Sequence, residues 1–225
     1  MYALELLYRT KCGGFVHFAP PCSSFVWVSR NSTKRSRANP VGDESIVGVR
    51  MANLIVARVI VLCLLAMKRG IHFMLEQPAS SLMRKMPVFQ KVARHFNIFE
   101  FFTWMGMFGS PTPKPTKLWS GSEWLCEVTR KLERSMFKHI EPNTKTYTRY
   151  TDSNGKIRTK GTKSMKASQQ YPDGYGKELA RLYTEIGHKH GVTKPWTDIS
   201  DDPVWHSAKL SIVEDAFTVI SDDDE

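Results

Sequence analysis

Residues 15–25 constrain the fold of this chain more than any other segment. The short apolar run Phe15-Val-His-Phe-Ala19 is followed directly by Pro20 and Pro21. Such a run is typical of a short buried strand. Proline fixes φ and has no N–H to donate, so the chain must leave the sheet there. Cys22 then lies just beyond the carboxyl end of a strand, which is where open α/β sheets bind their ligands.

Cys22 has two interpretations. Cysteine is among the most frequently buried residue types, so Cys22 could be a small core residue. Its thiolate would also be the strongest nucleophile available to a protein at neutral pH. Four basic residues follow within fifteen positions and are expected to lower the pKa of the thiol. They are Arg30, Lys34, Arg35 and Arg37, and Ser23 and Ser24 directly follow the cysteine.

Strand and helix patterns alternate along the first 132 residues. Strands are predicted over residues 15–19, 71–76 and 99–105, with a short edge strand over 117–119; helices are predicted over 3–11, 44–69, 80–86, 87–96 and 122–132; and residues 31–43 are predicted to form a long exposed loop. This alternation predicts an α/β fold with a parallel or mostly parallel sheet. The helix over 44–69 would provide the crossover between the first two strands.

The character of the sequence changes after residue 140. Residues 146–159 predict a basic hairpin with Asn154-Gly155 at its turn. A helix is predicted over 175–188. The chain finishes in Ser-Asp-Asp-Asp-Glu, which is typical of a disordered acidic tail. We therefore expect an α/β domain over 1–140, a basic α+β extension over 141–196 and a tail over 197–225.

Charge is distributed unevenly along the chain. Residues 1–196 hold 31 Lys/Arg and 13 Asp/Glu, a balance of +18, whereas residues 197–225 hold one Lys and nine acids, a balance of −8. A body this basic favours a polyanionic partner, nucleic acid above all. The alternative is ordinary solvated surface charge.

Cysteine usage and hydropathy restrict the cellular setting. The four cysteines form no C-x-x-C pair, which argues for free thiols in a reduced compartment and against a zinc ribbon. No secretory signal pattern is present at the N-terminus. The longest apolar run, 55–67, is interrupted by Arg58 and is too short to span a bilayer. We expect an intracellular protein, nuclear if its partner is DNA, without a membrane partner.

Glu76 is the second candidate site residue. In Leu75-Glu-Gln-Pro78 a carboxylate stands at the predicted end of the second strand. If the first two strands are neighbours, Cys22 and Glu76 can face one pocket and act on an electron-poor ring, the thiol on carbon and the acid on a ring nitrogen. Alternatively, Glu76 caps the helix that follows.

Three segments together resemble the cytosine-C5 DNA methyltransferases, and in particular divergent methyltransferase-like domains of protist and mobile-element proteins. Pro20-Pro21-Cys22-Ser-Ser-Phe25 is similar to the nucleophile loop of that family. Leu75-Glu76-Gln77-Pro78 is similar to its strand-end Glu-Asn element, with Gln in place of Asn. Phe108-Gly-Ser-Pro-Thr-Pro-Lys-Pro-Thr-Lys117 is similar to a later glycine-rich basic loop. The resemblance covers roughly residues 13–132 and reaches weakly to Gln170-Tyr-Pro172.

The resemblance implies a partial Rossmann-like methyltransferase sheet and a role for each matching residue. Cys22 would add to C6 of a flipped cytosine, and Glu76 would contact N3 and the exocyclic amine. Lys114 or Lys117 would take the basic role beside the pocket. Phosphates would be held near the nucleophile loop, and Trp27 would stack on a base. The residues expected to contact nucleic acid are Ser23, Ser24, Trp27, Arg30, Lys34, Arg35 and Arg37.

The resemblance also implies S-adenosylmethionine as cofactor, but the matching binding motif is missing. The family places a glycine-rich turn after a strand upstream of the nucleophile loop. Here Gly13-Gly14 precedes the first strand, so no cofactor-binding residue is assigned. A preceding segment or a second chain would have to complete the cofactor half.

Other functions remain open from the sequence. The chain could be a nucleic-acid-binding module without catalysis, or a scaffold that keeps only the methyltransferase fold. A Cys–His hydrolase that pairs Cys22 with His17 or His72 is a further alternative. His188-Lys-His190 lacks a third ligand in pattern, so no metal site is expected.

Overall fold

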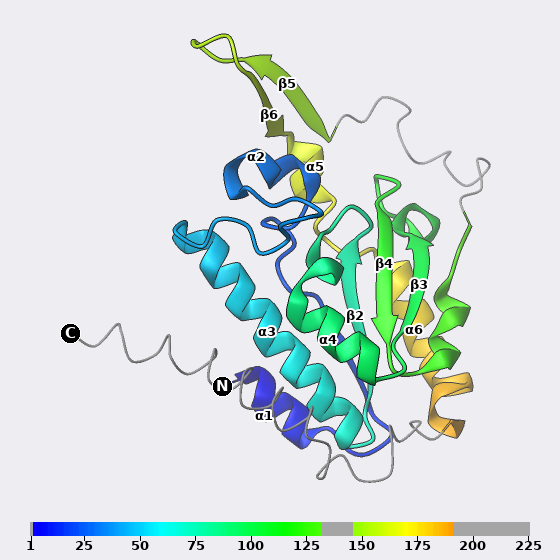
Figure 1. Cartoon of the computed structure of the whole chain (residues 1–225). Helices are drawn as coiled ribbons and strands as arrows, with labels where there is room; N and C mark the ends of the chain where they lie inside the picture. Colours follow the sequence, from blue (N-terminus) through cyan, green and yellow to red (C-terminus); the bar gives the residue numbers. More distant parts are fainter. Residues whose placement is uncertain (1, 132–145, 191–225) are drawn as a thin grey trace.

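The computed structural model describes residues 2–131 and 146–190 and centres on a four-stranded sheet. The strands are β1 (Phe15–Phe18), β2 (His72–Pro78), β3 (Phe99–Trp104) and β4 (Pro115–Ser120), in the order β1-β2-β4-β3. β1 pairs parallel with β2, whereas β4 pairs antiparallel with both β2 and β3. The fold is thus mixed α/β, but the prediction of a mostly parallel sheet is wrong (Figure 1).

The error concerns β4. Its residues 117–119 were predicted to form a short edge strand, but β4 is six residues long and lies between β2 and β3. β1, β2 and β3 nevertheless share one direction, because β2 and β3 both run opposite to β4. The carboxyl ends of these three strands and the start of β4 therefore lie at one edge of the sheet, called the carboxyl edge below.

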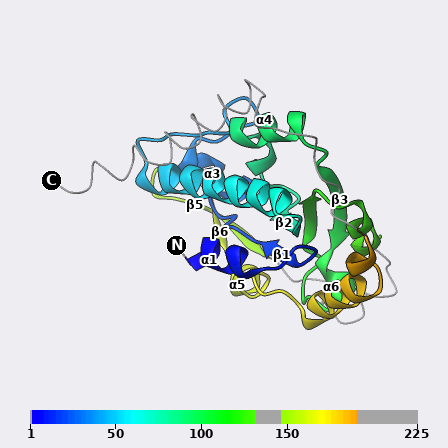
Figure 2. The same cartoon turned by 90° about the horizontal axis from the view of Figure 1, so that it is seen from below.

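Helices cover both faces of the sheet. α3 (Val47–Lys68) and α4 (Pro87–His95) pack on one face and α6 (Asp173–Glu185) packs on the other (Figure 2). The two faces follow from alternation along β2. Phe73 and Leu75 join the cluster under α3 and α4, whereas Met74 joins the cluster under α6.

α3 is long and apolar enough to cross a membrane, judged by length and composition alone. In this fold part of the helix, including Val56, Ile60 and Ala66, is buried in the core cluster that covers the sheet, whereas Val47 and Val61 are exposed. Only 39% of the apolar window is buried, so core burial accounts for part of this apolar sequence. The absence of a membrane partner stays a prediction.

The remaining elements are short. They are α1 (Tyr2–Arg9), α2 (Arg30–Thr33), α5 (Lys163–Ala167), the hairpin strands β5 (Tyr147–Thr151) and β6 (Ile157–Gly161), and the 3-10 turns η1 (Trp27–Ser29), η2 (Met83–Lys85), η3 (Met105–Phe108), η4 (Glu123–Val128) and η6 (Gly187–Lys189). The predicted hairpin and the helices over 3–11, 44–69 and 87–96 are confirmed within a few residues. The helix over 122–132 is wrong: η4 is a 3-10 turn, and the Ser122 side chain bonds to His72 rather than capping it.

The hydrophobic core of the domain includes residues beyond position 140. Tyr175, Leu179 and Leu182 of α6 belong to one buried cluster with Met74 and Leu118 of the sheet. The segment 141–196 therefore supplies one layer of the domain predicted over 1–140. The hairpin β5–β6 instead projects from this body beside α2 (Figure 1). The tail over 197–225 lies outside the described residues.

Candidate active site at the carboxyl edge

The Cys22 loop is tied to the sheet at both ends. Next to β1, the Gln77 side-chain amide donates a hydrogen bond to the Pro20 carbonyl at 2.7 Å. At the other end, the Leu82 N–H donates to the Phe25 carbonyl at 3.0 Å, and the Phe25 N–H donates back to the Cys22 carbonyl at 2.9 Å. Cys22 itself is half-buried. The two prolines and these bonds fix where the thiol lies.

The Arg35 side chain holds the same loop through hydrogen bonds. Its guanidinium donates to Ser24 Oγ at 3.1 and 3.0 Å and to the carbonyls of Pro40 and Val41 at 2.5 and 2.9 Å. It also lies 4.0 Å from the centre of the Phe25 ring. Burial lowers the pKa of Arg35 to about 10, so it stays charged at neutral pH. With 2% of its surface exposed, Arg35 supports the fold, and the prediction that it contacts phosphate is wrong. The predicted long exposed loop over 31–43 is exposed for the most part, but it begins in α2 and buries Thr33 and Arg35.

Glu76 is buried near the end of β2, with 4% of its surface exposed. The Tyr171 hydroxyl donates a hydrogen bond to Glu76 Oε2, and Lys114 Nζ lies 3.7 Å from Oε1. Oε1 has no hydrogen-bond partner. Burial raises the pKa of Glu76, and the neighbouring Lys114 and Tyr171 offset only part of this. Because Glu76 lies within the strand and bonds to Tyr171, it does not cap the following helix.

Lys114 comes from the connection between β3 and β4. Its φ of 34° is in the left-handed region, which is uncommon for a residue with a side chain. Its ammonium group lies 4.6 Å from the centre of the Tyr171 ring. Lys114 therefore contacts both members of the Glu76–Tyr171 pair.

His17 and Tyr175 complete the surroundings of the Tyr171 ring. The His17 ring lies edge-on at 5.4 Å, and the Tyr175 ring lies nearly parallel at 5.7 Å. Burial and the positive charge of Lys114 lower the pKa of His17 to about 4, so the imidazole is neutral at pH 7. Its Nε2 is buried without a hydrogen-bond partner.

The charges of Glu76 and Lys114 affect the Cys22 thiol. Burial and the negative charge of Glu76 raise the pKa of its thiol, whereas the positive charge of Lys114 lowers it. The net shift is upward, so the prediction that nearby basic residues lower the thiol pKa is wrong. The cation that acts on Cys22 is Lys114, which comes from a distant part of the sequence.

Lys117 and His72 lie away from this group. Lys117 points to the opposite face of β4 from Leu118, and its ammonium pairs with Glu100 at 2.6 Å. His72 begins β2 at the other edge of the sheet, where its Nδ1 lies 2.6 Å from Ser122 Oγ. Of the two candidate lysines, the structure brings only Lys114 to Glu76, and of the two candidate histidines only His17 lies nearby.

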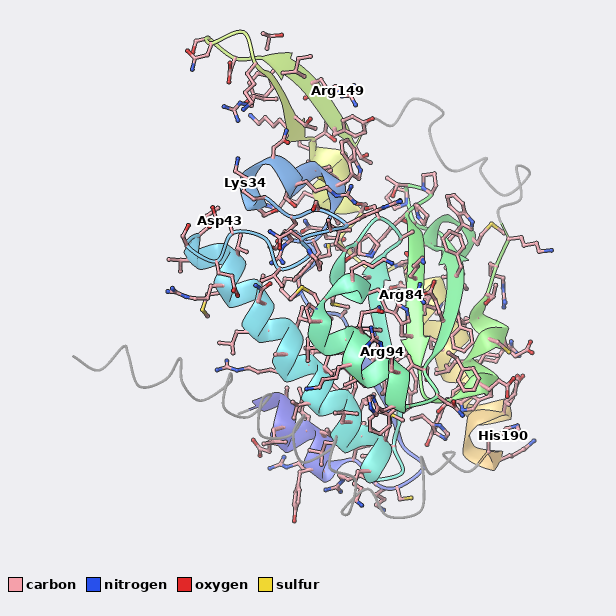
Figure 3. The ribbon with its side chains drawn as sticks, viewed as in Figure 1. Lys34, Asp43, Arg84, Arg94, Arg149 and His190 are labelled. Carbon is pink, nitrogen blue, oxygen red and sulfur yellow. The ribbon has the colours of Figure 1, made fainter. Side chains whose placement is uncertain are left out.

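A basic surface adjoins the Cys22 loop. Ser23, Lys34 and Arg37 are exposed, Arg30 is half-buried, and Trp27, 37% exposed, packs edge-on against Tyr147 of the hairpin at 4.8 Å. Residues 146–166 add six Lys/Arg and only one acid. Figure 3 shows Lys34 beside α2 and Arg149 on the hairpin, at the same end of the molecule. Of the expected nucleic-acid contacts, Trp27 and Lys34 therefore lie at the same end of the molecule as the basic hairpin.

Sequence reasoning missed the contributions of Tyr171, His17 and Gln77. Tyr171 was reached only through the weak resemblance at Gln170-Tyr-Pro172, without a role. The sequence offers His17 only as an alternative partner of Cys22. In the structure it pairs in register with Met74, two residues before Glu76 in β2, and so faces the side of the sheet that Glu76 shares.

Within residues 2–131 and 146–190, no group of three or more His, Cys, Asp or Glu side chains is arranged to hold a metal ion. No protein-family model, curated protein or solved structure matches this chain.

Proposed function

We propose that this domain binds a nucleic-acid base at the carboxyl edge and that Cys22 adds to it, as in the cytosine-C5 DNA methyltransferases that the chain resembles. The observation that supports this best is that Glu76 of β2 and Lys114 of the β3–β4 connection form an ion pair at 3.7 Å, and that the charges of both act on Cys22 in the connection after β1. The β1-α3-β2 unit, a parallel pair joined by a helix, is also the unit from which Rossmann-like sheets are built.

The chemistry assigns a role to each residue. Attack by the Cys22 thiolate on C6 of cytosine forms an S–C6 bond and shifts the C5–C6 π electrons into the ring. A protonated Glu76 gives its proton to N3 and so neutralises the ring. For the protons to balance, Glu76 first accepts the thiol proton as a carboxylate and then gives that same proton to N3, so Glu76 ends ionised and one proton has moved from sulfur to N3. The raised pKa of Glu76 favours the protonated carboxyl that this step uses.

The glycine pair Gly13-Gly14 does not provide a site for S-adenosylmethionine beside Cys22. The glycine pair closest to β1 lies at the opposite edge of the sheet, where the Gly13 N–H donates to the Gly70 carbonyl at 2.7 Å and the Tyr183 hydroxyl donates to the Gly13 carbonyl at 2.9 Å. These contacts tie Gly13, just before β1, to Gly70 after α3 and to α6, so this glycine pair is not placed at the carboxyl edge. We therefore derive no methyl-transfer step. S-adenosylmethionine, and a further segment or second chain that would bind it, remain predictions.

A second function, nucleic-acid binding without catalysis, is favoured by the basic surface. The hairpin is exposed along both strands and has aromatic residues, Tyr147 and Tyr150, among its basic residues. Basic side chains bind phosphates and aromatic rings stack on bases. Duplex DNA is the expected partner, and a nuclear location would follow from it.

Trapping tests the catalytic proposal. Duplex DNA containing 5-azacytosine has an electron-poor C6 that accepts a thiolate without methyl transfer. We expect a denaturation-stable adduct on the Cys22 peptide, with and without S-adenosylmethionine. Cys22→Ser should abolish the adduct and Glu76→Gln should slow its formation. The matched control is Cys126→Ala, because Cys126 is an exposed thiol outside the site.

The outcomes separate the two functions. An adduct on Cys126, or none at all with DNA still bound, would refute the catalytic proposal and leave nucleic-acid binding. A salt titration tests binding itself: log Kd should rise with log salt concentration, with a slope that falls by about one for each phosphate-contacting cation removed. Arg149→Ala should reduce the slope, whereas Arg94→Ala, on α4, should leave it unchanged. A slope near zero would reject the basic surface as the binding site.

A further inference from the structure

We propose that Tyr171 occupies the ring-binding position of this site as an internal ligand, and that a substrate ring binds by displacing it. This inference rests on the proposed function for the identity of the substrate. The occupation itself is argued from the contacts of Tyr171 alone.

The contacts of Tyr171 are those expected of a bound aromatic ligand. Its hydroxyl donates to the buried Glu76 carboxylate, and its ring lies 4.6 Å from the Lys114 ammonium. Tyr175 lies nearly parallel to the ring, at an interplanar angle of 22°, and His17 meets it edge-on. A carboxylate, a cation and aromatic rings around one planar group make a general site for a flat ring that bears a hydrogen-bond donor.

Tyr171 satisfies only part of the hydrogen-bonding capacity of the side chains around it. It donates to Oε2 of Glu76, whereas Oε1 is buried, accepts no hydrogen bond and faces only the Lys114 ammonium at 3.7 Å. His17 Nε2 is also buried without a partner. Buried polar atoms in native proteins are usually hydrogen-bonded, so unsatisfied atoms around one ring indicate a ligand with more donors than a phenol. A ring with two adjacent N–H groups, such as cytosine protonated at N3, could donate to both carboxylate oxygens.

The position of Tyr171 in the chain permits displacement. It lies in the connection between α5, which ends at Ala167, and α6, which begins at Asp173. The preceding Gln169 and Gln170 are exposed, and Tyr171 itself is half-buried over a carboxylate that is almost fully buried. A change within this short connection would uncover Glu76 without moving α6.

The first test measures how fast Cys22 is alkylated by iodoacetamide, with peptide mapping to separate it from the exposed Cys12 and Cys126. Tyr171 lies near enough to Cys22 for their charges to interact, so its ring is expected to hinder access to the half-buried thiol. A minor open state is commonly populated at 10% or less, so Tyr171→Ala should accelerate alkylation by up to about tenfold. Tyr150→Ala, an exposed hairpin tyrosine, is the matched control and should leave the rate unchanged.

Chemical rescue distinguishes the loss of the Tyr171 ring from a general destabilisation of the fold in Tyr171→Ala. Free p-cresol, which is the tyrosine side chain, should restore slow alkylation to Tyr171→Ala. It should fail to do so when Glu76→Gln is added, because the carboxylate that accepts the phenol is gone. A wild-type alkylation rate in Tyr171→Ala would overturn the inference, and so would acceleration that p-cresol does not reverse.

The second measurement separates this inference from the proposed function. If both are right, Tyr171→Ala also forms the 5-azacytosine adduct faster than the wild type. Faster alkylation with p-cresol rescue but no DNA adduct in either protein supports the internal ligand and refutes base addition. An adduct that forms at equal rates in both proteins supports base addition and refutes the internal ligand.

Discussion

The buried guanidinium of Arg35 gives the sharpest stability prediction. It donates to Ser24 Oγ and to the carbonyls of Pro40, Val41 and Val49, and it lies over the Phe25 ring. A hydrogen bond that involves a charged group contributes about 1.5–3 kcal/mol, but burial of the charge costs several kcal/mol in return. Arg35→Ala removes the charge itself but strands buried carbonyl oxygens, at a cost of about 1–3 kcal/mol for an unsatisfied group, so we expect a net loss of about 2–4 kcal/mol.

Urea denaturation followed by tryptophan fluorescence measures this loss as a shift in midpoint at constant slope. Arg35→Lys keeps the charge but a single nitrogen cannot reach all the acceptors, so its midpoint should lie between those of Arg35→Ala and the wild type. Exposed Arg37→Ala is the control and should stay within about 0.5 kcal/mol of the wild type. A loss below about 1 kcal/mol for Arg35→Ala would show that the guanidinium does not hold the Cys22 loop.

Three further predictions concern the site and the α6 layer. Because burial raises the pKa of Glu76 above 4.5, the folded state binds its proton more tightly than the unfolded state, and wild-type stability should fall as pH rises from 4.5 through the folded pKa. Glu76→Gln cannot titrate at this position, so its stability relative to the wild type should increase over that pH window, as measured by denaturation at a series of pH values. Parallel curves of stability against pH for the two proteins would contradict the pKa shift. Gly174→Ala should lower the free energy of unfolding by about 1–3 kcal/mol, because the added Cβ would lie 2.4 Å from the Phe108 carbonyl oxygen. Gly176→Ala, in open space on the same helix, should raise it by up to about 1 kcal/mol. Equal melting temperatures for the two variants would refute this packing. Gln77→Ala should cost about 1–3 kcal/mol and speed Cys22 alkylation, since the Pro20 carbonyl loses its donor; an unchanged alkylation rate would show that the loop holds itself.

The elements that could be predicted from sequence are those encoded locally. The Pro20-Pro21 pair ends β1, and the apolar run of α3 specifies a buried helix between two parallel strands. Cys22 follows β1 and Glu76 lies two residues before the end of β2, and the parallel direction of these two strands was correctly predicted. These features depend on neighbours within one element or one connection.

The features that were missed depend on pairing across the fold. The sequence of residues 115–120 does not indicate that this strand pairs with β2 as well as with β3, which is why only a short edge strand is predicted there. Arg35 looks like a surface residue in a basic loop, and only the convergence of Ser24, Val41 and Val49 reveals its acceptors. Tyr171 reaches Glu76 across 95 positions of sequence, a contact that no local pattern indicates.

The placement of α6 also affects how the protein is made. The four strands are complete once residue 120 has been synthesised, but the helix that covers Met74 and Leu118 ends at residue 185. At translation rates of about 5–20 residues per second, the nascent chain leaves this apolar face uncovered for on the order of 3–13 s. During that interval the domain is a natural client for chaperones that bind exposed apolar surface, and ribosome pausing before residue 185 would prolong its exposure to aggregation.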